Sequence, residues 1–327
     1  MSTVDYAVTE LSAEEQILAR PVRSLWTDAM ARLKRNHLAI VGLIMILFFL
    51  VISFAAPLIA PHPPLKVYRG MSQLPPVFAK VSESGVKADP RFFFGTDSIG
   101  RDVLSRVIYG GRASMLVGII PVTVILIIGT TIGLISGYAG GWVDNLLMRL
   151  TDVVYAFPDL LFYILLMITL RETYFGRMLG GMLLLFLALA VVSWVGVARL
   201  VRSEVLAIKE KGFIEAARSV GASNSRIILR HILPNTLSPL IVWAAFSIPR
   251  MIIVEAVLGY IGIGLRLETN DNAFFISSWG GLMSTGQASI TSQPWVLLTP
   301  SICVALVVLS FTFIGDGLRD AFDPRMR

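Results

Sequence analysis

Six long apolar segments restrict what this chain of 327 residues can fold into. A helix that crosses a membrane needs about 20 mostly apolar residues, and each segment approaches or exceeds that length. Hydrophobic residues make up 55% of the sequence and charged residues only 15%, whereas an ordinary soluble domain has roughly a quarter charged residues. We therefore expect an all-α integral membrane protein with six transmembrane helices, at about residues 38–60, 113–137, 149–170, 178–198, 237–259 and 296–315.

The polar stretches between these segments predict the organisation of the chain. The apolar run that starts at residue 38 is longer than the roughly 7–15 residues of a signal-peptide core and should remain as an anchor. Before it, residues 22–35 have apolar side chains on one helical face and basic side chains opposite, which predicts a helix in the membrane interface. We divide the chain into a cytoplasmic tail and interfacial helix (1–37), a first transmembrane helix (38–60), an extracytoplasmic loop (61–112), a core with five transmembrane helices (113–316) and a cytoplasmic C-terminal tail (317–327).

The basic residues indicate the orientation in the membrane. With both termini in the cytoplasm, more than half of the 28 lysines and arginines lie on the cytoplasmic side, including the cluster directly before the first segment. Loop 61–112 is also basic and argues the other way, although long loops weigh less in this rule. We expect both termini to be cytoplasmic, and read the net charge of +6 as this bias and not as a nucleic-acid surface.

Several enzyme classes lack their characteristic residues in this sequence. The single cysteine, Cys303, excludes an intramolecular disulfide, and three scattered histidines make a histidine-based metal site unexpected. The sequence contains no Gly-Lys pair and therefore no phosphate-binding loop of the GxxxxGK[ST] type. It also has no HExxH or GxSxG motif. We expect that the chain is not an enzyme and binds no metal or cofactor of its own.

The basic loop 199–235, between the fourth and fifth segments, has the pattern of a folded structure. Gly221 is placed to end one helix and Ser223 to cap a second at about 224–233, which Pro234 would end. Two short helices joined at a glycine predict a rigid knob that exposes Phe213 and Ile214 to a grooved protein partner. The alternative is a loop that only connects two spans.

Four motifs in the same order resemble one family. The loop contains a Glu-Ala-Ala sequence, a glycine four residues later and a Leu-Pro pair, at Glu215, Ala216, Ala217, Gly221, Leu233 and Pro234. His231 departs from this pattern, which usually has isoleucine there. The other three motifs are FGTDSIGRDVLSRVIYGGRAS (94–114), GYAGGWVDNLLMRLTD (137–152) and GDGLRDAFDPR (315–325). Together they resemble the C-type permease chain of the dipeptide, oligopeptide and nickel importers of the ATP-binding-cassette (ABC) class.

The resemblance implies a subunit of a larger machine in the cell (inner) membrane. Its partners would be a homologous B-type permease chain, two ABC ATPase subunits, an extracytoplasmic substrate-binding protein and the lipid bilayer, with no nucleic acid. The Glu-Ala-Ala segment would be a coupling helix that docks into a cleft of an ATPase, and ATP and magnesium would be bound by those partners. The expected cargo is peptides, and nickel chelates, glutathione, short sugars or other small solutes are alternatives.

A few polar residues are candidates for a role outside the coupling loop. Glu255, inside the fifth segment, is either a gate or substrate contact, or a hydrogen-bonding group between helices. Asp152 and Asp159 are expected on one face of the third segment, near its inner end and in water. A polar motif precedes the second segment and consists of Gly95, Thr96, Asp97, Gly100, Arg101 and Asp102. We interpret it first as a structural turn held by ion pairs, and second as a contact for the substrate-binding protein.

Two other classes of membrane protein are alternatives that the sequence favours less. A self-contained secondary transporter would need no ATPase-docking loop and usually carries inverted repeats, which this sequence does not show. An intramembrane enzyme is disfavoured by the missing nucleophile and metal motifs. For a permease we expect a weakly binding pathway lined mainly by apolar and small side chains, among them Gly118, Gly129, Gly133, Ser238, Ala244 and Ala245.

Overall fold

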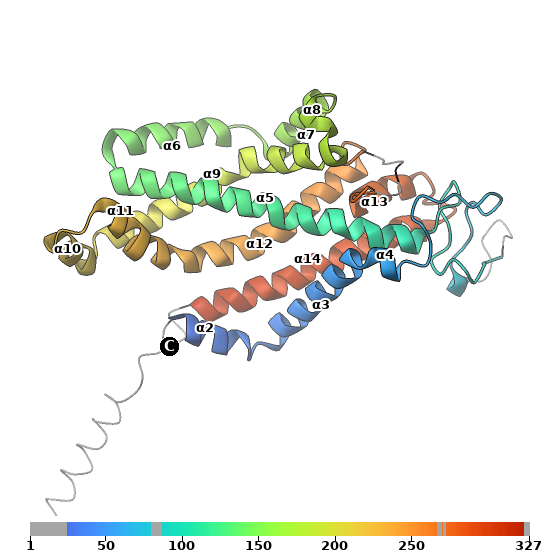
Figure 1. The fold of residues 1–327 in the computed structure, drawn as a ribbon, viewed down its shortest axis with the longest axis horizontal. Coiled ribbons are helices and arrows are strands. Elements are labelled where there is room, and N and C mark those ends of the chain that lie inside the picture. Colours follow the sequence, from blue (N-terminus) through green and yellow to red (C-terminus); the bar gives the residue numbers. More distant parts are fainter. Residues whose placement is uncertain (1–24, 80–86, 267–269, 271–272, 324–327) are drawn as a thin grey trace, which may run out of the picture.

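The computed structural model describes residues 25–79, 87–266, 270 and 273–323, and within these ranges it is built from helices without extended strands. The expected tail at 1–20 and the last residues of the C-terminal tail lie outside the described residues. Figure 1 shows an elongated bundle whose long helices run along its length. The main helices are α2 (Leu25–Leu33), α3 (His37–Phe54), α5 (Val103–Ala139), α6 (Gly141–Tyr155), α7 (Asp159–Leu170), α9 (Met182–Lys209), α10 (Gly212–Ser219), α11 (Asn224–Ile227), α12 (Leu233–Tyr260), α13 (Trp279–Gln287) and α14 (Pro294–Phe322).

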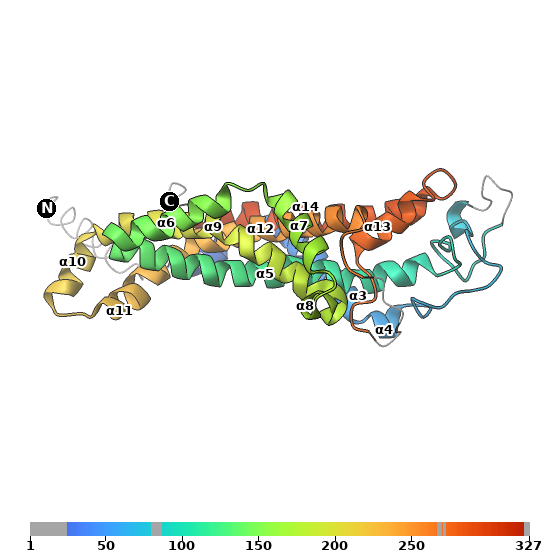
Figure 2. The ribbon, with the colours of Figure 1, turned by 90° about the horizontal axis from the view of Figure 1, so that it is seen from above.

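The two ends of the bundle carry different elements. Helices α10, α11 and α2 lie at one end with the C-terminal end of α14, while α13 and the loop before α5 lie at the other (Figures 1 and 2). Arg32 of α2 donates a hydrogen bond of 3.5 Å to the carbonyl of Asp323, which ties the two terminal helices together. The short helices α4 (Ala56–Ile59) and α8 (Tyr174–Arg177) lie toward the α13 end.

Among the described residues, five helices or helix runs are long and apolar enough to cross a membrane, and a sixth span exists if the bent pair α6 and α7 counts as one. The expected count of six is thus confirmed with one broken member. The 37 residues of α5 would extend about 55 Å at 1.5 Å per residue, which is longer than the roughly 30 Å of a bilayer core. Hydropathy detects only the apolar part of such a helix, and this is why α5 begins at Val103 and not near residue 113.

The third span is broken at Pro158, where a proline inside the segment predicts a kink. Helices α6 and α7 meet at an angle of 78°, and Pro158 occupies the N-cap position of α7. A residue before proline is disfavoured in the helical conformation, and the chain turns here. The expectation that Asp152 and Asp159 share one helical face is therefore wrong: Asp152 pairs with Arg199 at 2.9 Å, whereas Asp159 pairs with Arg250 at 2.8 Å.

Helices α5 and α9 form the most extensive helix contact in the described residues. Small residues on α5 allow it. A Cβ atom on Gly129 would lie 2.5 Å from Cβ of Val197, and one on Gly133 would lie 2.6 Å from the carbonyl oxygen of Ala198. Close backbone approach of this kind is the usual way in which membrane helices associate. Gly129 and Gly133, which we expected among the residues that line the pathway, are instead packed against α9.

A second apolar cluster joins the terminal helices to the rest of the bundle. Helices α3 and α14 lie side by side in Figure 1, and their buried side chains pack with those of α13 and the first part of α5. Trp279, at the start of α13, is 1% exposed, and its indole donates a hydrogen bond of 2.9 Å to the carbonyl of Val107. The tryptophan thus fixes α13 against α5.

Candidate functional site

The connection between α9 and α12 forms a small knob at one end of the bundle. Helix α10 ends in two backbone hydrogen bonds, from Gly221 to Arg218 and from Ala222 to Ala217, at 2.9 and 3.0 Å. This pattern needs a left-handed residue after the helix, and Gly221 has φ of +79°. The side chain of Ser223 then accepts a hydrogen bond from the backbone of Arg226 and caps α11. Both predicted helix signals are confirmed.

Two features of the predicted knob need correction. Helix α9 continues to Lys209, so the first part of the expected loop 199–235 is helical, and Pro234 does not end the second helix. A π-helical stretch, Ile228–Ile232, connects α11 directly to α12, and Pro234 lies in the first turn of α12. The first turn of a helix tolerates a residue without an N–H, and therefore the chain continues as one helical run, Asn224–Tyr260.

Helix α10 presents the Glu-Ala-Ala motif on its outer surface. Glu215 and Ala216 are exposed, Ala217 is half-buried, and Phe213 is 45% exposed. Ile214, which we expected on the surface, is fully buried, because the apolar side of this amphipathic helix faces the core. The remaining motif residues, Leu233 and Pro234, lie at the start of α12, half-buried and exposed respectively.

Tyr138, near the end of α5, holds the knob against the bundle. Its carbonyl accepts a hydrogen bond of 2.8 Å from Nζ of Lys209, and its hydroxyl donates one of 2.7 Å to Oδ1 of Asn224. The guanidinium of Arg218 lies 6.0 Å from the centre of the Tyr138 ring, within reach of a cation–π interaction. Tyr138 thus joins α5 to α9 and α11 by hydrogen bonds, and its ring lies beside Arg218 of α10.

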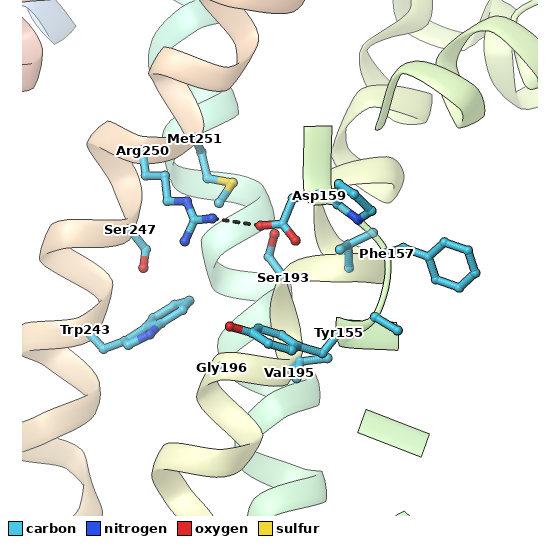
Figure 3. A pocket seen from close by; sticks show the side chains of 13 residues that line it. Tyr155, Phe157, Asp159, Ser193, Val195, Gly196, Trp243, Ser247, Arg250 and Met251 are labelled. Atoms are coloured by element: carbon cyan, nitrogen blue, oxygen red, sulfur yellow. Dashed lines mark hydrogen bonds and ion pairs between the residues drawn. The ribbon is translucent and has the colours of Figure 1, made fainter. Parts of the chain in front are cut away.

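A pocket of about 480 Å³ lies between the break in the third span and helices α9 and α12. In Figure 3, Arg250 of α12 and Asp159 of α7 point toward one another, and the Tyr155 hydroxyl points toward Trp243. Nη2 of Arg250 lies 2.8 Å from Oδ2 of Asp159. Other pocket residues, such as Ser193, Gly196 and Ser247, are small. None of the small residues that we expected along the pathway lines this pocket, and its wall carries a charged pair.

The sequence did not predict this pair, because Asp159 was expected to lie in water. The available signal was the presence of two opposite charges within separate apolar segments, because charges in a membrane usually pair with one another. Only the bend at Pro158 brings the two together, and the sequence does not reveal its angle.

The polar motif before α5 forms an ion-paired turn. The Asp97 carboxylate accepts hydrogen bonds from Nε of Arg101 at 2.8 Å and from Nη1 of Arg106 at 2.6 Å. Asp102 caps α5 by accepting a hydrogen bond of 2.9 Å from the backbone of Ser105. Thr96 is fully buried and bridges the backbone of Leu74 and Met71, while Gly95 and Gly100 have φ of +72° and +88°. These contacts match the structural interpretation of the motif.

Glu255 does not face the pocket. It is fully buried where α12 packs against α5 and α13, and its Oε2 accepts a hydrogen bond of 2.9 Å from Ser114. The hydroxyl of Ser114 in turn accepts one of 3.1 Å from the backbone of Trp279. This geometry corresponds to the second expectation for Glu255, a hydrogen-bonding group between helices. No cluster of three or more metal-ligating side chains exists among the described residues.

Long apolar helices that surround a partly polar pocket and carry an exposed, rigid helix at one end define a multi-pass membrane protein of the transporter class. Two family models match the chain: the binding-protein-dependent transport system inner membrane component over residues 129–327, and the N-terminal TM domain of oligopeptide transport permease C over residues 24–76. The chain therefore belongs to the inner membrane permease family of binding-protein-dependent ABC importers.

Curated relatives agree with this assignment along most of the chain. The dipeptide transport system permease protein DppC of Alkalihalophilus pseudofirmus is 40% identical over 93% of this chain and 91% of its own. The oligopeptide transport system permease protein OppC of Escherichia coli K12 is 40% identical, with 93% of both chains covered. A chain of the inward-facing MetNI methionine ABC transporter is similar in fold, with a TM-score of 0.50 and 17% identity over 66% of this chain and 95% of that one.

Proposed function

We propose that this chain is the C-type permease subunit of an ABC importer for peptides and forms half of the translocation pathway. The observation that supports the cargo is that relatives 40% identical over 93% of the chain are named as dipeptide and oligopeptide permeases. A homologous B-type permease chain forms the other half of the pathway, because six spans are few to enclose a solute of this size.

The proposed role of α10 is that of a coupling helix. Its exposed Glu215 and Ala216 dock into a cleft of an ABC ATPase, where Glu215 forms a charge-assisted hydrogen bond and the two alanines permit close approach. ATP and magnesium are bound by the two ATPase subunits, and this chain binds neither. An extracytoplasmic binding protein delivers the solute. Two contacts of α10 with the bundle support this role: Ile214 is buried in the main apolar cluster, and the guanidinium of Arg218 lies 6.0 Å from the centre of the Tyr138 ring.

In the proposed topology both termini and α10 are cytoplasmic, while α13 and the motif 94–102 are extracytoplasmic. Helices α2 and α10 lie at the same end of the bundle (Figure 1), as this topology requires. Single cysteines in place of Glu215 and Gln287, in a Cys303→Ser background, test it with an impermeant thiol reagent on intact cells. We expect labelling at position 287 only, and labelling at position 215 would reverse the topology.

The test of function is reconstitution of the complete transporter in proteoliposomes, with the second permease, both ATPases and the binding protein. We expect ATP-dependent uptake of labelled di- and tripeptides. The Glu215→Arg variant should assemble less tightly with the ATPases and lose uptake, whereas Glu172→Gln, at an exposed position remote from α10, should not. Absence of peptide uptake by the wild-type complex would refute the cargo.

Glutathione is the second candidate cargo. The glutathione transport system permease protein GsiD of Pectobacterium atrosepticum is 33% identical over 94% of both chains. Uptake of labelled glutathione in the same proteoliposomes, with unlabelled dipeptide as competitor, distinguishes the two.

A further inference from the structure

The Asp159–Arg250 pair lies where a charge facing lipid would be costly. Arg250 is inside α12, about 15 Å from its C-terminal end at 1.5 Å per residue, with apolar neighbours such as Met251 and Ile252. Its side chain is nevertheless 66% exposed in this chain, and that of Asp159 is 41% exposed. Charged side chains within membrane spans almost always face a bundle interior or a water-filled cavity. The face that carries the pocket therefore borders the pathway or another subunit, and not hydrocarbon.

Few contacts hold Asp159 and Arg250 together. The described contacts join Asp159 and Arg250 through one hydrogen bond, from Nη2 of Arg250 to Oδ2 of Asp159. In contrast, Arg202 binds Asp144 through two. A guanidinium has five N–H donors in a fork that matches a carboxylate, so Arg250 can bind an incoming carboxylate through two hydrogen bonds in place of its one to Asp159. An exposed ion pair contributes little stability, and an incoming carboxylate can displace Asp159 without unfolding the site.

The walls of the pocket suit a small, variable solute. Its volume of about 480 Å³ lies in the range of about 300–1,000 Å³ that is usual for small-molecule sites. Trp243 and Tyr155 offer aromatic surface beneath the pair, whereas Ser193, Ser247 and Gly196 leave room (Figure 3). Asp159 and Arg250 are the only charged side chains among the residues that line the pocket, so a ligand that is held by charge must be recognised through a charged group that does not vary.

We propose that Arg250 is a binding site for the terminal carboxylate of the transported peptide, and that Asp159 occupies the guanidinium as a placeholder when the pocket is empty. This inference rests on the proposed function. Every linear peptide with a free C-terminus carries this carboxylate whatever its side chains, and a site that binds it can serve many sequences. The binding is weak because the peptide must displace Asp159, as a transport pathway requires.

The proposal predicts opposite effects for the two members of one ion pair. In Arg250→Gln the carboxylate loses its partner, whereas in Asp159→Asn the competitor is removed and Arg250 becomes free. Loss of a hydrogen bond to a charged group corresponds to at least about a tenfold fall in affinity. If the pair were only structural, both variants would weaken the protein in the same direction.

The test is photo-crosslinking of a radiolabelled tripeptide with a photoreactive side chain to the reconstituted complete transporter, which compares the free acid with the C-terminal amide. We expect the wild type to prefer the acid, Arg250→Gln to lose this preference about tenfold or more, and Asp159→Asn to increase it. Asp152→Asn and Arg177→Gln are the controls, since both residues form exposed ion pairs and neither lines the pocket, and they should behave as wild type.

The possible results distinguish failure of the carboxylate-binding inference from failure of the proposed function. An unchanged acid-to-amide ratio in Arg250→Gln, or equal losses in Asp159→Asn and Arg250→Gln, overturns the inference while peptide uptake by the wild type still supports the proposed function. Failure of the wild type to import any peptide overturns both. If Arg250→Gln does not assemble, Arg250→Lys replaces it; Lys lacks the bidentate geometry and should show a smaller loss of acid preference, and an unchanged ratio overturns the inference.

Discussion

Arg202 of α9 binds the Asp144 carboxylate of α6 through two hydrogen bonds of 2.6 Å, from Nε to Oδ1 and from Nη2 to Oδ2. The hydroxyl of Ser136, near the end of α5, also binds Oδ1 of Asp144. Three helices therefore meet at one carboxylate. In Figure 1 this end of α6 lies toward α10, so the contact braces the helices to which the knob is attached.

Arg202→Lys should loosen this junction although it keeps the charge. Lysine cannot form the two parallel hydrogen bonds, and loss of a hydrogen bond to a charged group costs about 1.5–3 kcal/mol. We expect a lower thermal unfolding temperature of the purified complex in detergent. Arg199→Lys is the control, because Arg199 forms a single, more exposed contact with Asp152. Equal falls in unfolding temperature at the two positions would show that the bidentate contact of Arg202 stabilises the protein no more than the single contact of Arg199.

Packing between α5 and α9 gives a steric prediction. A Cβ atom on Gly133 would meet the carbonyl of Ala198 at 2.6 Å and Cβ of Val201 at 2.7 Å, and backbone cannot move aside cheaply. Gly133→Ala should destabilise by about 1–3 kcal/mol, the usual cost of overpacking, and Gly133→Val by more. Gly196→Ala, whose nearest heavy atom would be 3.9 Å away, is the control on α9. Thermal unfolding of the purified protein measures both, and an unaltered Gly133→Ala would contradict the tight α5–α9 contact.

Periodicity and hydropathy were sufficient for most spans but not for their ends or for the bend. The apolar core of α5 was found from the sequence, yet its first turns, which contain Arg106 and Arg112, were assigned to a loop because they are polar. Local helix signals at Gly221 and Ser223 gave the correct caps, since they act within a few residues. The Asp159–Arg250 contact depends on how two distant helices turn, and no local pattern encodes that.

Two substitutions of Gly221 distinguish an effect of backbone strain from an effect of surface charge. Its φ is +79°, and a Cβ atom added there would have no heavy atom within 4 Å, so a substitution meets strain but no clash. Asn tolerates the left-handed region better than most residues, and Gly221→Asn should therefore retain most uptake. Gly221→Asp has nearly the same shape but adds a negative charge at the proposed docking surface, and we expect it to uncouple ATP hydrolysis from uptake. Stimulated ATPase activity and uptake in proteoliposomes are the measurements; loss in both variants alike would assign the effect to strain.

The contact between Glu255 and Ser114 predicts that Glu255 has a structural role and not a gating role, because Glu255 is buried between helices. Oε2 of Glu255 accepts a hydrogen bond of 2.9 Å from Ser114, and Gln would keep an acceptor of the same shape. We therefore expect Glu255→Gln to preserve stability and peptide uptake. Glu255→Leu should lower stability by about 1–3 kcal/mol, because the Ser114 hydroxyl loses its buried acceptor.

A double-mutant cycle completes this test. If the Glu255–Ser114 contact is what stabilises the helix junction, Ser114→Ala should cost less in the Glu255→Leu background than in the wild type, since neighbouring residues are not additive. Thermal unfolding of the four proteins gives the coupling energy. Loss of uptake in Glu255→Gln at unchanged stability would instead make Glu255 a gate, which requires a second conformation in which α12 moves this carboxylate out of the contact with Ser114 and toward the pathway.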